Sequence, residues 1–503
     1  MLKQKTLGQV FTPDWIVDEI LNSVNYLDND ILYKKIIDPA CGDGAFLKNI
    51  VRRIIKKCIE IDATNERIIE ILENCVYGIE IDEIAFYNCI KNLNNIIKEE
   101  LKQDLSIKWK IFNDNTLYKF EDFIGFFDFV VGNPPYIRIH NLDDKTRKII
   151  KKYFIFSEGT IDIYISFFEL GFKMLNKNGK LGYITPNSYL HNSSYINFRK
   201  FLKNEKALKE LVDFKSKKIF NNFSTYTAIS IINFFEKTDS FKYKELVEDK
   251  IKIVSEIKYK ELNDKDWSFT NQENMIFLKK LYSNTNKKVS DFFDVQYGFA
   301  TLRDNIYIGE IRGEKNGLVL FNDYWIEKDI LHKIIKGSTY KGDSKDFKYI
   351  IFPYKIENFR YTIINEDDLA KNYPNAYKYL LDNKEELLRR DIDKRFLWYE
   401  FGRSQGIQTM HNKKIVIGTL IKDIIKYYEI DEDIFVYSGI FITRKSNKIN
   451  WDIIKSILSS DNFLRYIKIT GKDFSGGYKS ITTNQIKNFP TNEINNQSML
   501  FNL

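Results

Sequence analysis

Between about residues 30 and 235, short apolar runs alternate with longer segments that have the apolar spacing of helices. This alternation predicts a doubly wound α/β domain with a mixed, mostly parallel sheet, because strands joined by helical crossovers pair in parallel. Strands are expected at 35–38, 76–80, 127–131, 181–184 and 227–235, helices at 46–59, 83–100 and 161–176, and a turn at 176–180.

The alternation fades after about residue 240, where a charged stretch begins. We interpret 1–240 as the first domain, 241–285 as a connector and 286–503 as a second domain of mixed α+β structure. Strand-prone runs at 348–352 and 414–417, with helical segments such as 367–388 between them, support this interpretation.

The composition excludes several classes of protein. No run approaches the ~20 apolar residues that a membrane span needs, and the N-terminus lacks the apolar core of a signal peptide, so a cytoplasmic protein without a membrane partner is expected. The net charge of +8 is mild and fits a local basic cleft for nucleic acid. The cysteines and histidines show no metal-ligand spacing, so no metal is expected: Cys41, Cys58, Cys75, Cys89, His140, His191, His332 and His411.

Two acidic residues, Asp38 and Glu80, mark a candidate binding site for a ligand that resembles a nucleotide. Asp38-Pro39-Ala40-Cys41-Gly42-Asp43-Gly44-Ala45-Phe46 lies between a predicted strand and helix, where glycines let the backbone turn tightly and approach a ligand. The full G-x-G-x-x-G spacing and the lysine of a phosphate-binding loop are both missing. Glu80 ends the next strand, where an acid can accept both hydroxyls of a ribose. The alternative role of a helix cap suits Asp82 better.

Asn133-Pro134-Pro135-Tyr136 follows the strand at 127–131 and carries the most specific chemistry. An exocyclic amino group on an aromatic base is a poor nucleophile, because its lone pair is delocalised into the ring. The Asn133 side-chain oxygen and the Pro134 carbonyl can accept its hydrogens, and two prolines hold these acceptors rigidly. Tyr136 can stack on the base. The alternative is a Pro-Pro turn at the end of a strand.

The loop at Asp38–Phe46, the acid Glu80 and the motif Asn133–Tyr136 follow one another in this order. With these three elements, the chain resembles the gamma group of DNA adenine-N6 methyltransferases from restriction–modification systems. Gly8-Gln9-Val10-Phe11-Thr12-Pro13 is similar to the N-terminal motif of that group. The resemblance implies cofactor-binding roles for Thr12, Asp38, Pro39, Ala40, Gly42, Glu80, Ile81, Asp114, Asn133 and Pro135, and catalytic roles for Asn133, Pro134, Pro135 and Tyr136. Asp162-Ile163-Tyr164 and 177–186 also follow the order of the family.

The resemblance further implies that an aromatic side chain stacks on a flipped base, beside Tyr136. Phe220 is the expected residue and Phe223 its runner-up, the alternative being a core phenylalanine before a strand. In the second domain, similar in part to target-recognition domains, Arg403, Lys472 and Lys479 are candidates for DNA contacts. Ordinary solvated surface charges are the alternative for these three.

The resemblance therefore implies a Rossmann-like, S-adenosylmethionine-dependent, adenine-specific methyltransferase that flips its target base out of double-stranded DNA. Its expected role is host protection in a restriction–modification or phage-defence system. A separate cognate restriction endonuclease would be its partner, since the chain begins almost at the first motif and leaves no room for a nuclease domain. Methylation of a glutamine side chain, of an RNA base or of cytosine N4 are alternatives. The long second domain disfavours the first, and Asn133 in place of serine disfavours the last. A non-catalytic DNA-binding subunit is the alternative from another class.

Overall fold

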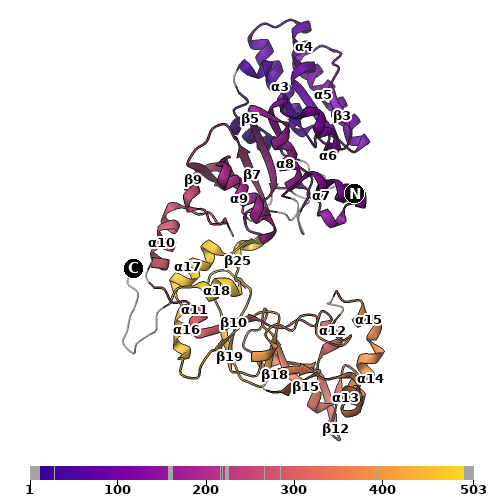
Figure 1. Cartoon of the computed structure of the whole chain (residues 1–503), viewed down its shortest axis with the longest axis vertical. Coiled ribbons are helices and arrows are strands. Elements are labelled where there is room, and N and C mark those ends of the chain that lie inside the picture. Colours follow the sequence, from indigo (N-terminus) through magenta and orange to yellow (C-terminus); the bar gives the residue numbers. More distant parts are fainter. Residues whose placement is uncertain are drawn as a thin grey trace. The chain divides into compact units, whose positions relative to one another are not determined.

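The computed structural model describes residues 12–27, 29–156, 162–215, 217, 219–220, 226–264, 267–283, 285–358, 360–391 and 395–491. The chain divides into two compact units, Met1–Gln272 and Glu273–Leu503 (Figure 1). Among the described residues, no helix is both long enough and apolar enough to cross a membrane.

One nine-stranded sheet forms the centre of the first unit. Its order is β3 (Lys110–Asn113), β2 (Val76–Glu80), β1 (Ile36–Asp38), β4 (Phe127–Gly132), β5 (Leu175–Pro186), β7 (Thr227–Ile232), β6 (Leu208–Asp213), β8 (Ser240–Val247) and β9 (Lys250–Lys258). The first five strands are parallel, and β7 pairs antiparallel with both β5 and β6. The predicted mixed, mostly parallel sheet is confirmed.

Helices cover both faces of this sheet. Its helices are α2 (Asp14–Ser23), α3 (Ala45–Glu60), α4 (Asn65–Cys75), α5 (Glu83–Leu101), α6 (Thr116–Lys119), α7 (Asp144–Tyr153), α8 (Tyr164–Met174) and α9 (Ile196–Glu205). Phe129 and Val131 share one core with α2, α3 and α5. Since successive strand residues point to opposite faces, Val130 lies on the face that α8 covers.

Parallel pairing brings the carboxyl ends of three strands to one edge of the sheet. Asp38 ends β1, Glu80 ends β2 and Gly132 ends β4, with β1 between the other two. In open α/β sheets, ligands bind in the crevice outside such strand ends. The fold therefore places the sequence motifs around a common space.

The predicted connector at 241–285 is wrong in its first part, because β8 and β9 extend the sheet of the first unit. Phe241 and Tyr243 are buried, whereas Lys242 between them is exposed. A strand with one buried face has this alternation, and its lysines made the segment resemble a linker. The predicted turn at 176–180 lies inside β5, where the pairing with β4 shifts register between Phe127 and Phe129.

Among its described residues, the second unit contains five small sheets, most of whose strands pair antiparallel, with short helices between them. The sheets are β10 (Phe293–Tyr297), β23 (Ile440–Arg444), β19 (Lys414–Ile417), β21 (Tyr427–Ile430); β11 (Ile308–Gly309), β16 (Lys348–Ile351), β15 (Leu331–Lys336), β22 (Ile434–Tyr437); β12 (Ile311–Lys315), β13 (Leu318–Phe321), β14 (Tyr324–Glu327); β17 (Tyr354–Glu357), β18 (Arg360–Ile363); and β20 (Leu420–Ile421), β25 (Tyr478–Ser480), β24 (Asp473–Phe474). Its helices are α10 (Gln272–Ser283), α11 (Val289–Phe292), α12 (Asp304–Tyr307), α13 (Glu366–Asn372), α14 (Pro374–Asp382), α15 (Lys384–Leu388), α16 (Trp451–Leu458), α17 (Asp461–Thr470) and α18 (Thr483–Asn488). The helical segment expected at 367–388 is divided among α13, α14 and α15. The break between α13 and α14 falls at Pro374, because a proline cannot continue a preceding helix.

Close packing of α2 on the sheet generates a stability prediction at Gly182 of β5. A Cβ atom added there would lie 2.7 Å from Ile20 Cγ2 and 2.8 Å from Val24 Cγ1. We expect Gly182→Ala to lower the free energy of unfolding of the first unit by about 1–3 kcal/mol, the usual cost of overpacking. Chemical denaturation measures this loss. Gly313→Ala in the second unit is the control and should leave unfolding of the first unit unchanged, since the nearest atom to its added Cβ is at 3.8 Å. If the first unit of Gly182→Ala were as stable as that of the control, the packing argument would be contradicted.

Candidate active site

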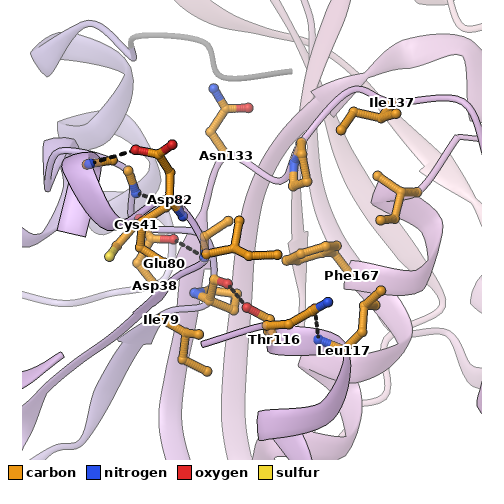
Figure 2. Close-up of a pocket in the computed structure, with 18 of the residues that line it drawn as sticks. Asp38, Cys41, Ile79, Glu80, Asp82, Thr116, Leu117, Asn133, Ile137 and Phe167 are labelled. Carbon is orange, nitrogen blue, oxygen red and sulfur yellow. Dashed lines mark hydrogen bonds between the residues drawn. The ribbon is translucent and has the colours of Figure 1, made fainter. Parts of the chain in front are cut away.

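A pocket of about 660 Å³ opens at the carboxyl ends of β1, β2 and β4 (Figure 2). Its walls come from the loop after β1, the start of α5, the segment before α6, the loop after β4, the start of α7 and the start of α8. The lining residues are Thr12, Asp38, Pro39, Ala40, Cys41, Gly42, Asp43, Ala45, Phe46, Ile79, Glu80, Ile81, Asp82, Ile84, Ala85, Asn88, Asn115, Thr116, Leu117, Asn133, Pro135, Ile137, Asn141, Leu142, Asp143, Thr146, Ile163 and Phe167.

The loop after β1 presents bare backbone to this pocket. Gly42 has φ +57°, and no atom lies within 4 Å of the position that a Cβ would take there. The loop is held at its base by a hydrogen bond from the Cys41 amide to the Ile79 carbonyl, at 3.0 Å. A ligand can therefore approach the backbone at Gly42 more closely than it could with any side chain present.

Glu80 fastens this loop to the end of β2. One carboxylate oxygen accepts from the Gly42 amide and the other from the Asp82 amide, each at 2.8 Å. Burial raises the pKa of the Glu80 carboxyl, while these two hydrogen bonds oppose the shift. Because each carboxylate oxygen has two lone pairs, Glu80 can accept one further hydrogen bond at each oxygen. Asp82 caps α5 by accepting from the Ala85 amide at 2.9 Å, as predicted.

Asp38 is buried directly beneath the Asn133–Tyr136 motif. Its Oδ1 accepts from the Ala40 amide at 3.0 Å, and a Cβ added at Gly132 would lie 2.6 Å from the same oxygen. Residue 132 must therefore be glycine for this carboxyl to lie under the end of β4. Burial, reinforced by the negative charge of Glu80, raises the pKa of Asp38 to about 8, against the lowering effect of the Ala40 hydrogen bond.

The Asn133 side chain is oriented by Thr12. Its Nδ2 donates to the Thr12 hydroxyl oxygen at 3.0 Å, which determines which end of the amide is the acceptor Oδ1. Asn133 and Pro135 line the pocket, whereas Pro134 and Tyr136 are not among its lining residues. Figure 2 shows Asn133 apart from Asp38 and Glu80, on another wall.

Tyr136 and Phe220 lie next to each other beside this motif. Their ring centres are 6.5 Å apart in an edge-on arrangement, and the Tyr136 hydroxyl is 3.5 Å from the Ile184 carbonyl oxygen. Phe220 is 4% exposed and belongs to the core around β1 and β4. Phe223 and the motif residues 8–11 lie outside the described residues. The stacking role of Phe220 stays a prediction.

Nine of the ten expected cofactor residues line the pocket, and Asp114 is the exception. The Asp114 carboxylate accepts from the Asn115 amide at 2.7 Å, and the pocket wall is formed by Asn115, Thr116 and Leu117 instead. Neither this segment nor the wall made by Asn141, Leu142, Asp143 and Thr146 was predicted from the sequence. The wall that includes Asp143 and Thr146 could have been predicted, because a basic sequence with helical spacing follows the Asn133–Tyr136 motif.

All three basic candidates of the second unit lie on segments whose backbone is paired. The Ser480 amide donates to the Lys472 carbonyl, and Lys479 is paired in register with Asp473. The Lys479 ammonium forms an ion pair with Asp473 at 2.8 Å. Arg403 is exposed, and its backbone exchanges two hydrogen bonds with Ala300. Contacts of these residues with DNA stay predictions.

Comparison with known proteins finds proteins that are similar to this chain. Residues 64–220 match the family model described as Eco57I restriction-modification methylase. The chain is 27% identical to the type II restriction enzyme and methyltransferase RM.Eco57I of Escherichia coli, over 93% of this chain and 55% of that protein. It is 24% identical to the type II methyltransferase M.BstVI of Geobacillus stearothermophilus, over 90% of this chain and 84% of that one. This chain thus spans about half the length of RM.Eco57I.

Two solved structures have a similar fold. One is the type IIL restriction-modification enzyme MmeI in complex with DNA, with a TM-score of 0.63 and 14% identity over 94% of this chain and 65% of that chain. The other is a nuclease-deletion mutant of the type ISP restriction-modification enzyme LlaGI with a DNA substrate mimic, with a TM-score of 0.52 and 14% identity over 90% of this chain and 51% of that chain. Both show that the fold is shared.

The raised pKa of Asp38 predicts how stability depends on pH. Between the ordinary pKa of an aspartate, 3.8, and about 8, the folded chain binds a proton at Asp38 that the unfolded chain has lost. Stability that depends on this proton is present at low pH and is lost as the pH rises toward 8. We expect Asp38→Asn, which keeps the acceptor for Ala40, to flatten the decline in unfolding free energy between about pH 4 and 8. Parallel pH profiles of the two proteins in denaturation experiments would contradict this assignment.

Proposed function

We propose that the chain is a member of the Eco57I-type restriction-modification methylase family and is the DNA methyltransferase of a restriction–modification system. We propose further that it methylates N6 of an adenine flipped out of double-stranded DNA, using S-adenosylmethionine. One observation carries the proposal: Asn133 lines the same pocket as Asp38 and Glu80, so an amino-polarising group and a nucleoside-binding wall face one space.

The pocket residues fit the proposed cofactor. Glu80 can accept from two ribose hydroxyls, and the bare backbone at Gly42 admits the close approach of a ligand. Ile81 and Ile84 line the pocket with side chains that are 57% and 65% exposed, which suits the faces of an adenine ring. When bound, S-adenosylmethionine supplies a methyl group made electrophilic by its sulfonium.

Asn133 and Pro134 would activate the other reactant. The Asn133 Oδ1 and the Pro134 carbonyl accept the two hydrogens of the adenine amino group, which draws the nitrogen toward tetrahedral geometry and localises its lone pair. The hydrogen bond from Asn133 to Thr12 and the fixed φ of the prolines keep these acceptors in place before the base arrives. Tyr136, with Phe220 beside it, provides an aromatic surface for the extrahelical base.

Several features favour adenine in DNA over the alternatives. Asparagine at position 133 favours adenine, because cytosine-N4 enzymes usually carry serine there. The second unit of Glu273–Leu503 is a large addition that methylation of a protein side chain does not need. RM.Eco57I is a type II restriction enzyme and methyltransferase, M.BstVI is a type II methyltransferase, and MmeI was solved with DNA. In such a system methylation protects host DNA from the matching cleavage, so we propose a cognate endonuclease as partner and the cytoplasm as the place of action.

A test of the cofactor site is Glu80→Gln. The exchanged amide places an N–H where Glu80 accepts, so cofactor affinity should fall by ~1.5–3 kcal/mol, roughly 10- to 100-fold. Calorimetry with S-adenosylmethionine measures this loss. Glu83→Gln, an exposed position in the first turn of α5, is the matched control and should bind normally. Unchanged affinity in Glu80→Gln would remove Glu80 from the site.

A test of catalysis compares Asn133→Ala with Phe220→Leu in one single-turnover assay with labelled cofactor. Loss of the Asn133 acceptor should slow methyl transfer by ~100–1,000-fold and change specific DNA binding much less. A fully active Asn133→Ala would defeat the mechanism.

Phe220→Leu keeps an apolar side chain in the core but removes a stacking surface worth ~1–3 kcal/mol. A 2-aminopurine at the target position should then report a smaller flipped population. Unchanged flipping would leave the mechanism standing and move the stacking role to Tyr136 or Phe223.

A further inference from the structure

Helix α7 (Asp144–Tyr153) carries dense positive charge at the edge of the pocket. Its sequence, DKTRKIIKKY, contains five cations and one acid. The cations are Lys145, Arg147, Lys148, Lys151 and Lys152. Of the ten residues in this helix, only Ile150 is buried. The helix therefore packs on the protein along a narrow face and exposes a broad, positively charged face.

Most cations of α7 lie on the side of the helix away from Ile150. At 100° per residue, Lys148 and Lys152 lie nearly opposite Ile150, and Lys151 lies a quarter turn from it. Lys148 and Lys151 are both exposed. Arg147 forms an ion pair with Asp144, and the Lys145 ammonium lies 5.7 Å from the centre of the Tyr118 ring of α6, so these two are partly engaged. The exposed surface therefore keeps most of its charge.

The position of α7 connects this charge to the proposed active site. Asn141, Leu142, Asp143 and Thr146 line the pocket that Asn133 also lines. Asp143 caps the helix by accepting from the Thr146 amide at 2.9 Å, so the first turn of α7 is anchored at the pocket wall. Figure 1 shows α7 beside α6, in agreement with the contact between Lys145 and Tyr118.

We propose that α7 binds phosphates of duplex DNA next to the target base, an inference that rests on the proposed function. A base that reaches Asn133 remains attached to its own strand, so the phosphates flanking it must lie close to the mouth of the pocket. Cations on an exposed helix at that mouth neutralise those phosphates and position the duplex without reading its sequence. A membrane surface fits less well, because Ile150, the central apolar residue of the helix, is already buried in the protein.

The test compares two double charge reversals in the full chain. Lys148→Glu with Lys151→Glu changes α7, and Lys56→Glu with Lys91→Glu is the matched control, since both of its lysines are exposed on α3 and α5. Lys56 and Lys91 lie about 16 Å and 12 Å along their helices from the ends that face the pocket, at about 1.5 Å per residue. Binding of S-adenosylmethionine without DNA is measured first, and should be equal in both variants and the wild type if both fold.

Binding of a duplex is then measured across a salt series. We expect the affinity of the α7 variant to fall at least tenfold at low salt. Its slope of log affinity against log salt should be smaller by about 0.9 for each phosphate that is no longer neutralised, so by about 1.8 for two. The control variant should keep the slope of the wild type. Equal affinity and slope in the two variants would overturn the role of α7 while leaving the methyltransferase proposal intact. A wild-type chain that binds cofactor but no duplex would overturn both.

If the α7 variant loses cofactor binding as well, a milder pair decides the question. Lys148→Gln with Lys151→Gln removes two charges without adding repulsion, and should lower the salt slope in the same direction with cofactor binding intact. A normal slope in this pair would overturn the inference.

Discussion

Parallel pairing of β1 with both β2 and β4 is the constraint on which the rest of the site depends. Because all three strands run the same way, Asp38, Glu80 and Gly132 end at one edge of the sheet. The loop after β1 then lies between the other two strand ends, where Glu80 accepts from its Gly42 amide. A register shift of a single residue would turn these side chains to the opposite face and separate the two halves of the pocket.

The same parallel pairing places two buried carboxyl groups, those of Asp38 and Glu80, close together at the strand ends. Hydrogen bonds from backbone amides decide how far each carboxylate is stabilised there. Glu80 is stabilised by two backbone amides and is oriented by them. Asp38 has one such bond, lies beneath Gly132, and its pKa rises to about 8. Burial without full compensation is costly, and such costs are typical of sites where function requires a charged or polar group in a fixed place. The apolar packing of α2, α3 and α5 on the sheet offsets the destabilisation at the strand ends.

Whether an element could be predicted from the sequence depends on the range of the interactions that form it. Strands β1, β2 and β4 and helices α3 and α5 were predicted within one or two residues, because each has a strong apolar period and a clear end signal. The strands β8 and β9 were not predicted, since only Phe241 and Tyr243 of β8 and Ile257 of β9 are buried and lysines occupy exposed positions in both. Asp114 is an acid at a strand end like Glu80, yet the neighbouring residues form the wall, because the backbone after β3 turns at Asn115 to begin α6.

By itself, the sequence determined the order of the motifs, the local turn chemistry at Gly42 and Gly44, and the chemical capacity of Asn133-Pro134-Pro135-Tyr136. These properties depend on residue type and on neighbours within a few positions, so no knowledge of distant contacts was needed. Only the tertiary structure decided that Thr12 orients Asn133 across 121 positions of chain, that Glu80 holds Gly42, and that the first turn of α7 forms a wall of the pocket. Such pairings arise from strand order and helix packing, which depend on the free energy of the whole core rather than on any local pattern.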